Sequence, residues 1–252
     1  MGIVETIIKK VLEKGTIIEK TKLSDSVYKI RIQRDAFASY DFVPGHFIRL
    51  GVGIGQDEIS IKDKVRSYSV WDIDKEKNTI DLAIATHSQG IGAKWVESCT
   101  PNDTVYFKWK KGKFLIDTNA DSYLFIGDIS ALSHLYIINR NLPESKQLNC
   151  LIYSQTNEDF FSDIDGTTPF HFHEMNENPS SVIISSLNSI VPEMKGNKMV
   201  YIAGDSRVCV ALTNYFRKEL NWSAKQIKTK PFWNPEKKGL EYLLSTSYHT
   251  HC

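Results

Sequence analysis

The stretch Arg66-Ser67-Tyr68-Ser69 carries a cation, a flat aromatic ring and two hydroxyls within four residues. In a β-strand, side chains alternate between faces, so Arg66 and Tyr68 would share one face and Ser67 and Ser69 the other. A guanidinium pairs with a pyrophosphate, an aromatic ring lies against an isoalloxazine, and hydroxyl or backbone donors serve its polar edge. The stretch therefore favours a flavin-binding strand over an ordinary exposed strand only if a second motif supports it.

A second stretch, Thr86-His87-Ser88-Gln89-Gly90-Ile91-Gly92-Ala93-Lys94-Trp95, follows further along the chain. Its two glycines precede a run, 93–98, that is typical of a short helix. The first N–H groups of a helix are free to bind a phosphate, and a helix entered through glycines exposes them. In this order the two stretches resemble the flavin site of the ferredoxin–NADP reductase superfamily, whereas either alone is weak evidence.

The composition is that of an ordinary folded protein. The 252 residues are 41% hydrophobic and 24% charged with a net charge of +1, which argues against disorder and against a globally basic nucleic-acid-binding protein. This length allows one large domain or two modest ones. Four cysteines lie far apart without a C-x-x-C pair, so we expect no metal site, no disulfide framework and reduced thiols in a cytoplasmic protein.

No apolar run reaches the length of a membrane span, so we expect no membrane insertion. At the N-terminus, Glu5, Lys9 and Lys10 interrupt any signal-peptide core. The apolar residues around them have helical spacing. We therefore expect an N-terminal helix that packs on the domain that follows.

The first half of the chain has the pattern of short antiparallel strands. Residues 27–32 alternate apolar and polar side chains, and Asn78 is a turn residue between two strand-like runs. The glycine-rich run 51–55 resembles a nucleotide loop, but no helix follows it, so we interpret it as a connection. The pattern predicts a six-stranded antiparallel barrel. The expected strands are 16–23, 27–32, the end of 42–50, 65–72, 79–86 and 104–109.

In the second half, apolar strands alternate with helical patterns. The run 123–126 ends in Gly127-Asp128 and precedes a helix whose buried face would carry Ala131, Leu132, Leu135 and Ile138. Alternation of this kind predicts a parallel sheet covered on both faces, with ligands beyond the carboxyl ends of its strands. Gly127-Asp128 and Gly204-Asp205-Ser206-Arg207 are expected at those ends. The other expected elements are strands 148–153, 182–184 and 199–203 and a helix over 207–220.

A barrel followed by a parallel sheet, with these motifs, resembles the siderophore-interacting proteins, flavin-dependent ferric-siderophore reductases of the same superfamily. The resemblance covers residues 15–239. The histidine before the glycines and the later tryptophan favour this family over flavin reductases in general. The motifs that carry it are 44–50, 66–69, 87–95, 125–132 and 203–206 with the region of Trp233.

The resemblance implies FAD in the barrel, NADPH or NADH on the second domain, and reduction of a ferric siderophore that releases Fe(II). Because the chemistry resides in the flavin, no catalytic residue of the protein is expected. We expect the FAD-binding β-barrel domain to cover 1–118, the NAD(P)H-binding α/β domain 119–239 and a C-terminal tail 240–252. The implied cofactor-binding residues are Arg66, Tyr68, Ser69, Thr86, His87, Gly92, Ala93, Lys94 and Trp95 for FAD, Asp128, Ser130, Gly204, Asp205, Ser206 and Arg207 for the nicotinamide dinucleotide, and Trp233 beside the flavin ring.

The chain departs from the family pattern in four places. Trp71 stands where a second arginine is usual, and Asp205 where a glutamate is usual. The usual Gly-Pro-Arg-Gly turn is Trp109-Lys110-Lys111-Gly112-Lys113, and the Tyr-Trp-Arg ending is Phe232-Trp233-Asn234. These changes spare the flavin motif and fall mainly where the electron donor or the iron chelate would bind.

Lysines near the motifs are candidates for binding an anionic ferric chelate. We expect Lys62 or Lys64 with Lys110, Lys111 and Lys113 to form a cationic mouth beside the flavin, the alternative being an exposed turn over 108–113. A second group surrounds Trp233, and its members would contact a 2′-phosphate, the chelate or only solvent. That group consists of Lys225, Lys228, Lys230, Lys237 and Lys238.

Two histidine-containing segments carry less weight. His171-Phe172-His173-Glu174 has a spacing that could direct two imidazoles to one side, but no further ligands converge in the sequence, so a loop is favoured over a metal site. His249-Thr250-His251-Cys252 is expected to be a frayed terminus.

The sequence thus predicts a monomeric ferric-siderophore reductase that binds no nucleic acid. One alternative is a general NAD(P)H:flavin or ferredoxin-type reductase, whose ferredoxin would be a separate protein because the chain has no four-cysteine module. The other is a non-enzymatic binding protein that has lost its flavin. Intact Arg66, Tyr68 and Ser69 argue against that reading.

Overall fold

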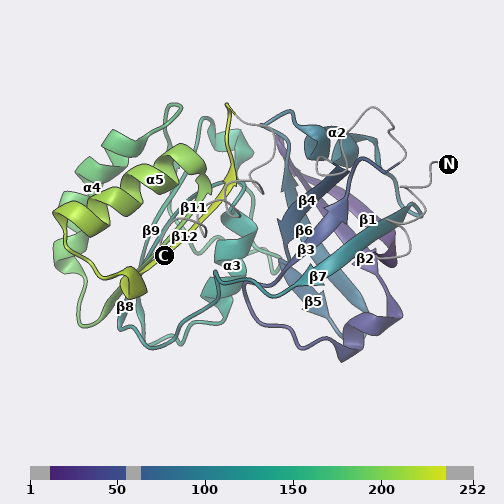
Figure 1. Cartoon of the computed structure of the whole chain (residues 1–252), viewed down its shortest axis with the longest axis horizontal. Helices are drawn as coiled ribbons and strands as arrows, with labels where there is room; N and C mark the ends of the chain where they lie inside the picture. The colour runs from purple at the N-terminus through teal and green to yellow at the C-terminus, as the bar shows by residue number, and fades with distance from the viewer. Residues whose placement is uncertain (1–11, 55–63, 237–252) are drawn as a thin grey trace, which may run out of the picture.

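The computed structural model describes residues 12–54 and 64–236. These residues form a seven-stranded antiparallel sheet from the first half of the chain and a five-stranded parallel sheet from the second (Figure 1). The expected N-terminal helix, Lys62 and the tail 240–252 lie outside the described residues. In the part of the chain that is described, no helix combines the length and the apolar character needed to cross a membrane.

The antiparallel sheet has the strand order β4-β3-β7-β1-β2-β6-β5. It curls until β4 touches β6, and its concave side encloses a core of aliphatic residues around Phe107 and Phe37. This is the barrel that the alternating pattern predicted. Its elements are β1 (Glu13–Ser24), β2 (Val27–Gln33), the 3-10 helix η1 (Asp35–Ser39), β3 (Phe47–Gly51), β4 (Val65–Ser69), β5 (Asp72–Asp74), β6 (Thr79–Ala85), α2 (Ile91–Ser98) and β7 (Thr104–Lys110).

The barrel has one strand more than the six expected, because the run 65–72 changes its partner halfway. The Val70 amide donates to the His46 carbonyl, whereas the next amide, that of Trp71, donates to the Asp81 carbonyl 2.8 Å away. The chain therefore leaves β3 and joins β6 as the separate strand β5. Asn78 adopts the left-handed conformation (φ 57°) in the turn between β5 and β6, as expected.

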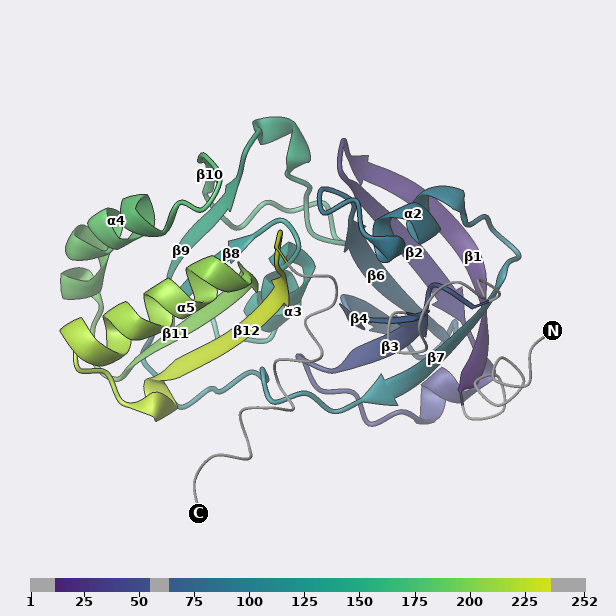
Figure 2. The ribbon, with the colours of Figure 1, turned by 45° about the horizontal axis from the view of Figure 1, so that its top comes forward.

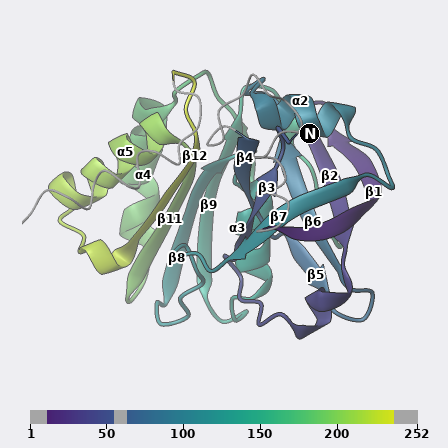
Figure 3. The ribbon, with the colours of Figure 1, turned by 45° about the vertical axis from the view of Figure 1, so that its right-hand side comes forward.

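The parallel sheet has the order β10-β9-β8-β11-β12. Helices α4 and α5 pack on one face, while α3 and the barrel cover the other (Figures 1, 2 and 3). The order reverses between β8 and β11, and a ligand crevice is expected outside the carboxyl ends at such a point. The elements are β8 (Ser122–Asp128), α3 (Leu132–Arg140), β9 (Gln147–Ser154), η3 (Asn157–Asp159), β10 (Phe172–Glu174), α4 (Ser180–Glu193), β11 (Lys198–Asp205), α5 (Ser206–Asn214), the π-helical turn η4 (Tyr215–Glu219), η5 (Ala224–Gln226) and β12 (Ile227–Trp233).

Two expectations for this half were wrong. Residues 182–184 form part of α4 rather than a buried strand: Ile183 and Leu187, one helical turn apart, are buried, while Val182 is 54% exposed. Helical burial therefore overrides the strand preference of β-branched residues. The segment expected as a loop at 171–174 forms the edge strand β10, paired with β9 in parallel.

A shared core fixes the two halves against each other. Val27 and Trp71 of the barrel are buried in the same cluster as Phe125, Leu135 and Tyr201 of the parallel-sheet half. An interface of this apolar character resembles a domain core rather than a sliding contact.

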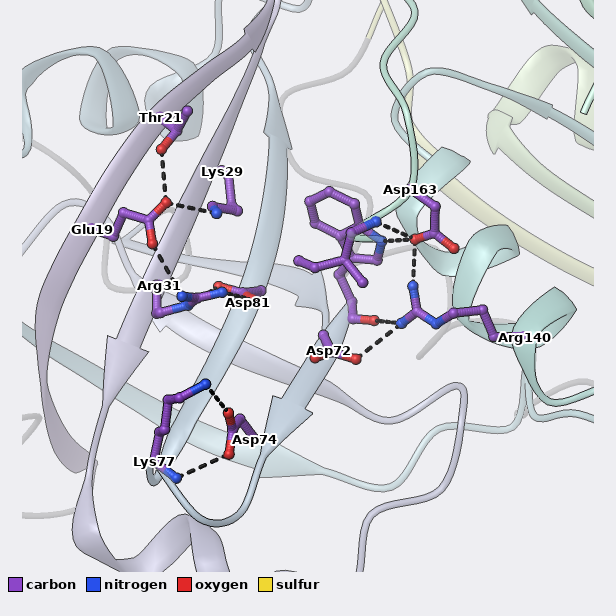
Figure 4. A network of polar contacts seen from close by, with 12 residues as sticks. Glu19, Thr21, Lys29, Arg31, Asp72, Asp74, Lys77, Asp81, Arg140 and Asp163 are labelled. Carbon is purple, nitrogen blue, oxygen red and sulfur yellow. Dashed lines mark hydrogen bonds and ion pairs between the residues drawn. The ribbon is translucent and has the colours of Figure 1, made fainter. Parts of the chain in front are cut away.

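A buried ion pair of the parallel-sheet half, Arg140–Asp163, lies at the same interface and binds Trp71 and Asp72 of the barrel (Figure 4). The Asp163 carboxylate, 1% exposed, accepts hydrogen bonds from the Arg140 guanidinium and, at 2.8 Å, from the indole nitrogen of Trp71. Arg140 also donates to the Trp71 carbonyl (2.8 Å) and to Asp72 (3.0 Å). Trp71 thus joins the barrel to the second half.

We expect Arg140→Met to lower the free energy of unfolding by about 3–5 kcal/mol, because it leaves the Asp163 carboxylate buried without its cation. Urea unfolding of the variant beside the wild type measures this difference. The exposed Arg217, changed to Met, is the matched control. Equal small effects of the two substitutions would contradict a stabilising role for the interface pair.

Candidate functional site

Strand β4 and the start of α2 form the first part of the site. A Cβ atom built on Gly92 would overlap the Tyr68 hydroxyl and lie 3.7 Å from Cγ of Arg66. Arg66 and Tyr68 therefore share the strand face that meets α2, as the alternation predicted. Burial raises the pKa of Tyr68, which keeps its hydroxyl protonated.

Helix α2 begins at Ile91 with Gly90 as its N-cap. Its first backbone hydrogen bond runs from Lys94 to the Gly90 carbonyl (3.1 Å), so the N–H groups before Lys94 precede the helical ladder. Within the helix, Ala93 is buried, whereas the Lys94 side chain is exposed. The structure thus brings Arg66, Tyr68 and the amides at the start of α2 together.

The other face of β4 leads to a histidine that the sequence analysis missed. The Ser69 hydroxyl lies 2.6 Å from Nδ1 of His134, and Nε2 of His134 lies 3.1 Å from the Phe114 carbonyl. A carbonyl only accepts, so Nε2 carries the proton and Ser69 donates to Nδ1. Burial lowers the pKa of His134 to about 3, and the imidazole is neutral. Its position on the predicted buried face of α3, between Ala131 and Ile138, was the available signal.

A cavity of about 260 Å³ opens at the carboxyl ends of the parallel strands. Both ring nitrogens of His87 and the hydroxyl of Tyr153 are buried there without a hydrogen-bond partner among the described residues. The Trp233 ring packs edge-on against His87 at 4.5 Å. Burial lowers the pKa of His87, so this imidazole is also neutral. The polar lining includes His87, Asp128, Tyr153, Ser154, Gln155, Asp159, Asn176, Glu177, Asn178 and Asp205.

Asp128 joins the elements around this cavity. One carboxylate oxygen accepts from the Ser130 amide (2.9 Å) and hydroxyl (2.5 Å). The other accepts from the Asp205 amide and the Trp233 indole, each at 2.7 Å. Gly204, at φ 118°, makes this approach possible, because a Cβ there would overlap the carboxylate.

The remaining predicted residues of this half lie beside Asp128 but pair with each other. The Asp205 side chain caps α5 and binds the Arg207 guanidinium (2.7 Å), whose other partner is Glu177 (3.0 Å). Both carboxylates raise the pKa of Arg207. Ser206 accepts a hydrogen bond of 2.6 Å from Asn234.

Contacts run without a break between the two parts of the site. His134, bound to Ser69, touches the ring of Phe232 with ring centres 5.9 Å apart. Phe232 precedes Trp233, which packs on His87. Thr86, in contrast, donates to the Ser26 carbonyl, and Trp95 packs on the barrel core.

The predicted lysines divide into two places. Lys110 pairs with Phe47 at one end of β3, and the exposed Lys111 and Lys113 follow it. Lys64 is 6% exposed and its carbonyl binds Val52 beyond the opposite end of β3. The structure therefore does not bring Lys64 to the other three.

Lys230 of β12, rather than Lys64, lies near Lys110, at the end of β3 where Phe47 is. Its ammonium is 4.5 Å from the centre of the Phe47 ring and 5.2 Å from that of Phe232. Burial, which no carboxylate of the described residues offsets, lowers the pKa of Lys230 to about 8.

Two family models together cover most of the chain. Residues 14–116 match the oxidoreductase FAD-binding domain, and residues 120–236 match the siderophore-interacting protein domain. The barrel and the parallel sheet coincide with the two matches.

Solved structures share the whole architecture. The siderophore-interacting protein SipS from Aeromonas hydrophila is 16% identical, with a TM-score of 0.77 over 94% of this chain and 97% of that one. The siderophore-interacting protein from Acinetobacter baumannii is also 16% identical, with a TM-score of 0.79 over 95% and 98%. Phthalate dioxygenase reductase gives 0.68 at 16% identity, over 88% of this chain and 68% of that one. At these identities the likeness concerns the fold.

Curated relatives include NADH-cytochrome b5 reductase 1 of Meyerozyma guilliermondii, 30% identical over 59% of this chain and 52% of that protein. The corresponding protein of Scheffersomyces stipitis is 27% identical over 78% and 72%. The chain spans about half the length of the first curated relatives that it matches.

FAD and NAD(P)H, the cofactors that these matches support, fit the residues present. The amides at the start of α2, packed on Tyr68 and Arg66, suit the phosphates of a flavin dinucleotide. The partnerless nitrogens of His87 and the hydroxyl of Tyr153 suit a polar ligand in the cavity at the carboxyl ends.

An FAD-binding barrel is thus followed by a siderophore-interacting domain in the architecture of ferredoxin–NADP reductase. The first half of the chain matches the oxidoreductase FAD-binding domain and the second half the siderophore-interacting protein domain.

Proposed function

We propose that the protein is an FAD-dependent NAD(P)H oxidoreductase that reduces the Fe(III) of a siderophore and so releases the iron. The observation that carries this proposal is the meeting of two half-sites across a rigid interface. Tyr68, Ser69 and Gly92 come from the barrel, Asp128 and Trp233 from the parallel sheet, and His134 links the two groups.

In the barrel half-site, Arg66 and the amides at the start of α2 would bind the pyrophosphate, and Tyr68 would lie against the isoalloxazine. The Ser69 proton is directed to His134, so the Ser69 oxygen is left to accept a hydrogen bond from the cofactor. FAD, when bound, couples a two-electron donor to a one-electron acceptor. The protein residues provide position rather than acid–base chemistry.

In the sheet half-site, Asp128 would keep the Gly127–Ser130 turn and Trp233 in fixed positions beneath a nicotinamide dinucleotide. His87 and Tyr153 would hydrogen-bond the ligand with the groups that lack protein partners. Ordering of this kind before binding lowers the entropy cost of bringing donor and flavin together.

Lys230 gives the strongest support for an anionic ferric chelate as the electron acceptor. Together with Lys110, Lys111 and Lys113 it would surround Phe47, which pairs with Ser69 in the β3–β4 register. A half-buried ammonium without a carboxylate partner costs stability, and an anionic ligand would recover that cost. Ferric chelates are often anionic, and oxygen ligands hold Fe(III) more strongly than Fe(II).

One second candidate has a specific observation in its favour. The curated relatives are NADH-cytochrome b5 reductases, so a protein electron acceptor at the same mouth is the alternative to a siderophore. The lysines would then bind an acidic protein surface.

The test is to reduce the purified yellow protein anaerobically with NADH or NADPH and to add a ferric catecholate or hydroxamate with an Fe(II) trap. We expect bleaching by the donor, then reoxidation with one Fe(II) per electron. If the donor bleaches the flavin but no Fe(II) forms, the protein is a general flavin reductase and a siderophore is excluded as its electron acceptor. A protein that binds no added FAD would contradict both functions.

Lys230→Met should stabilise the protein while weakening its function. The folded-state pKa of Lys230, about 8, lies below the unfolded value near 10.5, so the burial penalty is complete at pH 7 and disappears as the pH rises from 8 to 10.5. The variant should therefore gain up to about 3 kcal/mol at pH 7, and this advantage should shrink above pH 8.

The measurements are urea unfolding at pH 7 and pH 10 and the KM for an anionic ferric siderophore, which should rise several-fold in Lys230→Met. Lys225→Met, at an exposed position of η5, is the control. A variant with no gain in stability, or with an unchanged KM, would contradict the role given to Lys230.

A further inference from the structure

Among the residues that the structure describes, the lining of the proposed dinucleotide cavity has carboxylates but no lysine or arginine. Asp128, Asp159, Glu177 and Asp205 line it, and the adjoining hollow over β10 and the start of α4 is lined by Glu174 and Glu177. Neither lining contains a lysine or arginine among the described residues.

Arg207, which lies beside the lining residues Asp205 and Glu177, is bound to both of them. Arg207 binds both oxygens of Asp205, with Nε 3.2 Å from Oδ1 and Nη2 2.7 Å from Oδ2, and its Nη2 also lies 3.0 Å from Glu177. Lys230 lies at the far side of β12, against Phe47 and Phe232, and is absent from the cavity lining. Lys237 and Lys238 fall outside the described residues.

The two nicotinamide donors differ only in the 2′-phosphate, which carries about −1.5 to −2 charges at neutral pH. Its binding requires arginine or lysine, whereas a free ribose hydroxyl is well matched by a carboxylate. The cost of bringing the shared pyrophosphate near these acids is the same for both donors and cancels in the comparison.

Two of the carboxylates are placed to make this distinction. Asp159 follows the carboxyl end of β9, where the Ser154 and Ser26 hydroxyls fix its oxygens at 2.6 Å and 2.5 Å. Glu177 follows β10, the strand beside β9, is largely exposed and pairs with Arg207. Asn176 and Asn178 beside it, with Gln155, offer neutral hydrogen bonds to a ribose and adenine.

We propose that the cavity selects NADH over NADPH, with Asp159 and Glu177 as the residues that determine this specificity; the inference rests on the proposed function of the site as an electron-donor site. Asp159 would favour the 2′-hydroxyl. Glu177 would disfavour the 2′-phosphate in two ways: its own negative charge repels the phosphate, and its ion pair keeps Arg207 from binding the phosphate.

The test uses NAD⁺, NADP⁺, AMP and 2′-phospho-AMP as probes in calorimetric titrations of the FAD-loaded protein, so the readout is binding rather than turnover. We expect NAD⁺ to bind at least ten-fold more tightly than NADP⁺, and the two AMP probes to show the same order. In Glu177→Lys, which adds a cation and releases Arg207, the NADP⁺-to-NAD⁺ affinity ratio should rise at least ten-fold.

Glu193→Lys is the control, because it makes the same charge change at an exposed residue outside both linings. An equal shift in the ratio for both variants would mean general electrostatic steering and would overturn the assignment of Glu177. Tighter binding of NADP⁺ by the wild type would overturn the proposal and leave the reductase function intact. Failure of every probe to bind, with no bleaching by either donor, would overturn the donor site itself.

Discussion

The arrangement of the site depends on one carboxylate that accepts four hydrogen bonds. Asp128 ends β8 and holds the Ser130 turn, the start of α5 through the Asp205 amide and the Trp233 indole at the end of β12. A buried carboxylate with so many donors orders three chain segments at once, and each donor would be left unsatisfied without it. The glycine at 204 is required by the same contact. Hydrogen bonds within the protein therefore fix the crevice at the sheet's switch point.

The second requirement is that the barrel keep its place against this crevice. The apolar cluster around Trp71, Phe125 and Tyr201 holds it there. The polar contacts of Trp71 with Asp163 and of Asp72 with Arg140 add to this. Both flavin and nicotinamide chemistry depend on the separation of two rings held by different domains. Trp71 lies in this interface, where its indole donates to Asp163 and its carbonyl accepts from Arg140. Stability and cofactor geometry are thus coupled.

Local patterns were enough for the features that local geometry decides. The alternation in β4 predicted which face Arg66 and Tyr68 share, and the apolar strands ending in Gly127-Asp128 and Gly204-Asp205 predicted the edge at which the cavity lies. Patterns failed where distant contacts decide. Residues 182–184 have strand propensity, but they are helical because the helix buries Ile183 against the sheet. The run 65–72 splits into two strands because the Trp71 amide binds the Asp81 carbonyl.

The charged residues were the least predictable part of the site. The sequence analysis expected Lys64 and Lys110 to lie together beside the flavin. In the structure they lie at opposite ends of β3. Arg207 was expected to meet a cofactor, but its partner Glu177 comes from a loop thirty positions earlier in the chain. Ion pairs of this kind follow from tertiary placement, which composition and spacing do not encode.

A fluorescence titration of apo-protein with FAD examines the flavin site most directly. Gly92→Val inserts a side chain where the Tyr68 hydroxyl lies, and circular dichroism and the melting temperature establish whether the variant is folded. The wild type should bind one FAD per chain, and the folded variant should bind at least ten-fold more weakly. Equal FAD affinity in the two proteins would contradict a flavin held between Tyr68 and the start of α2.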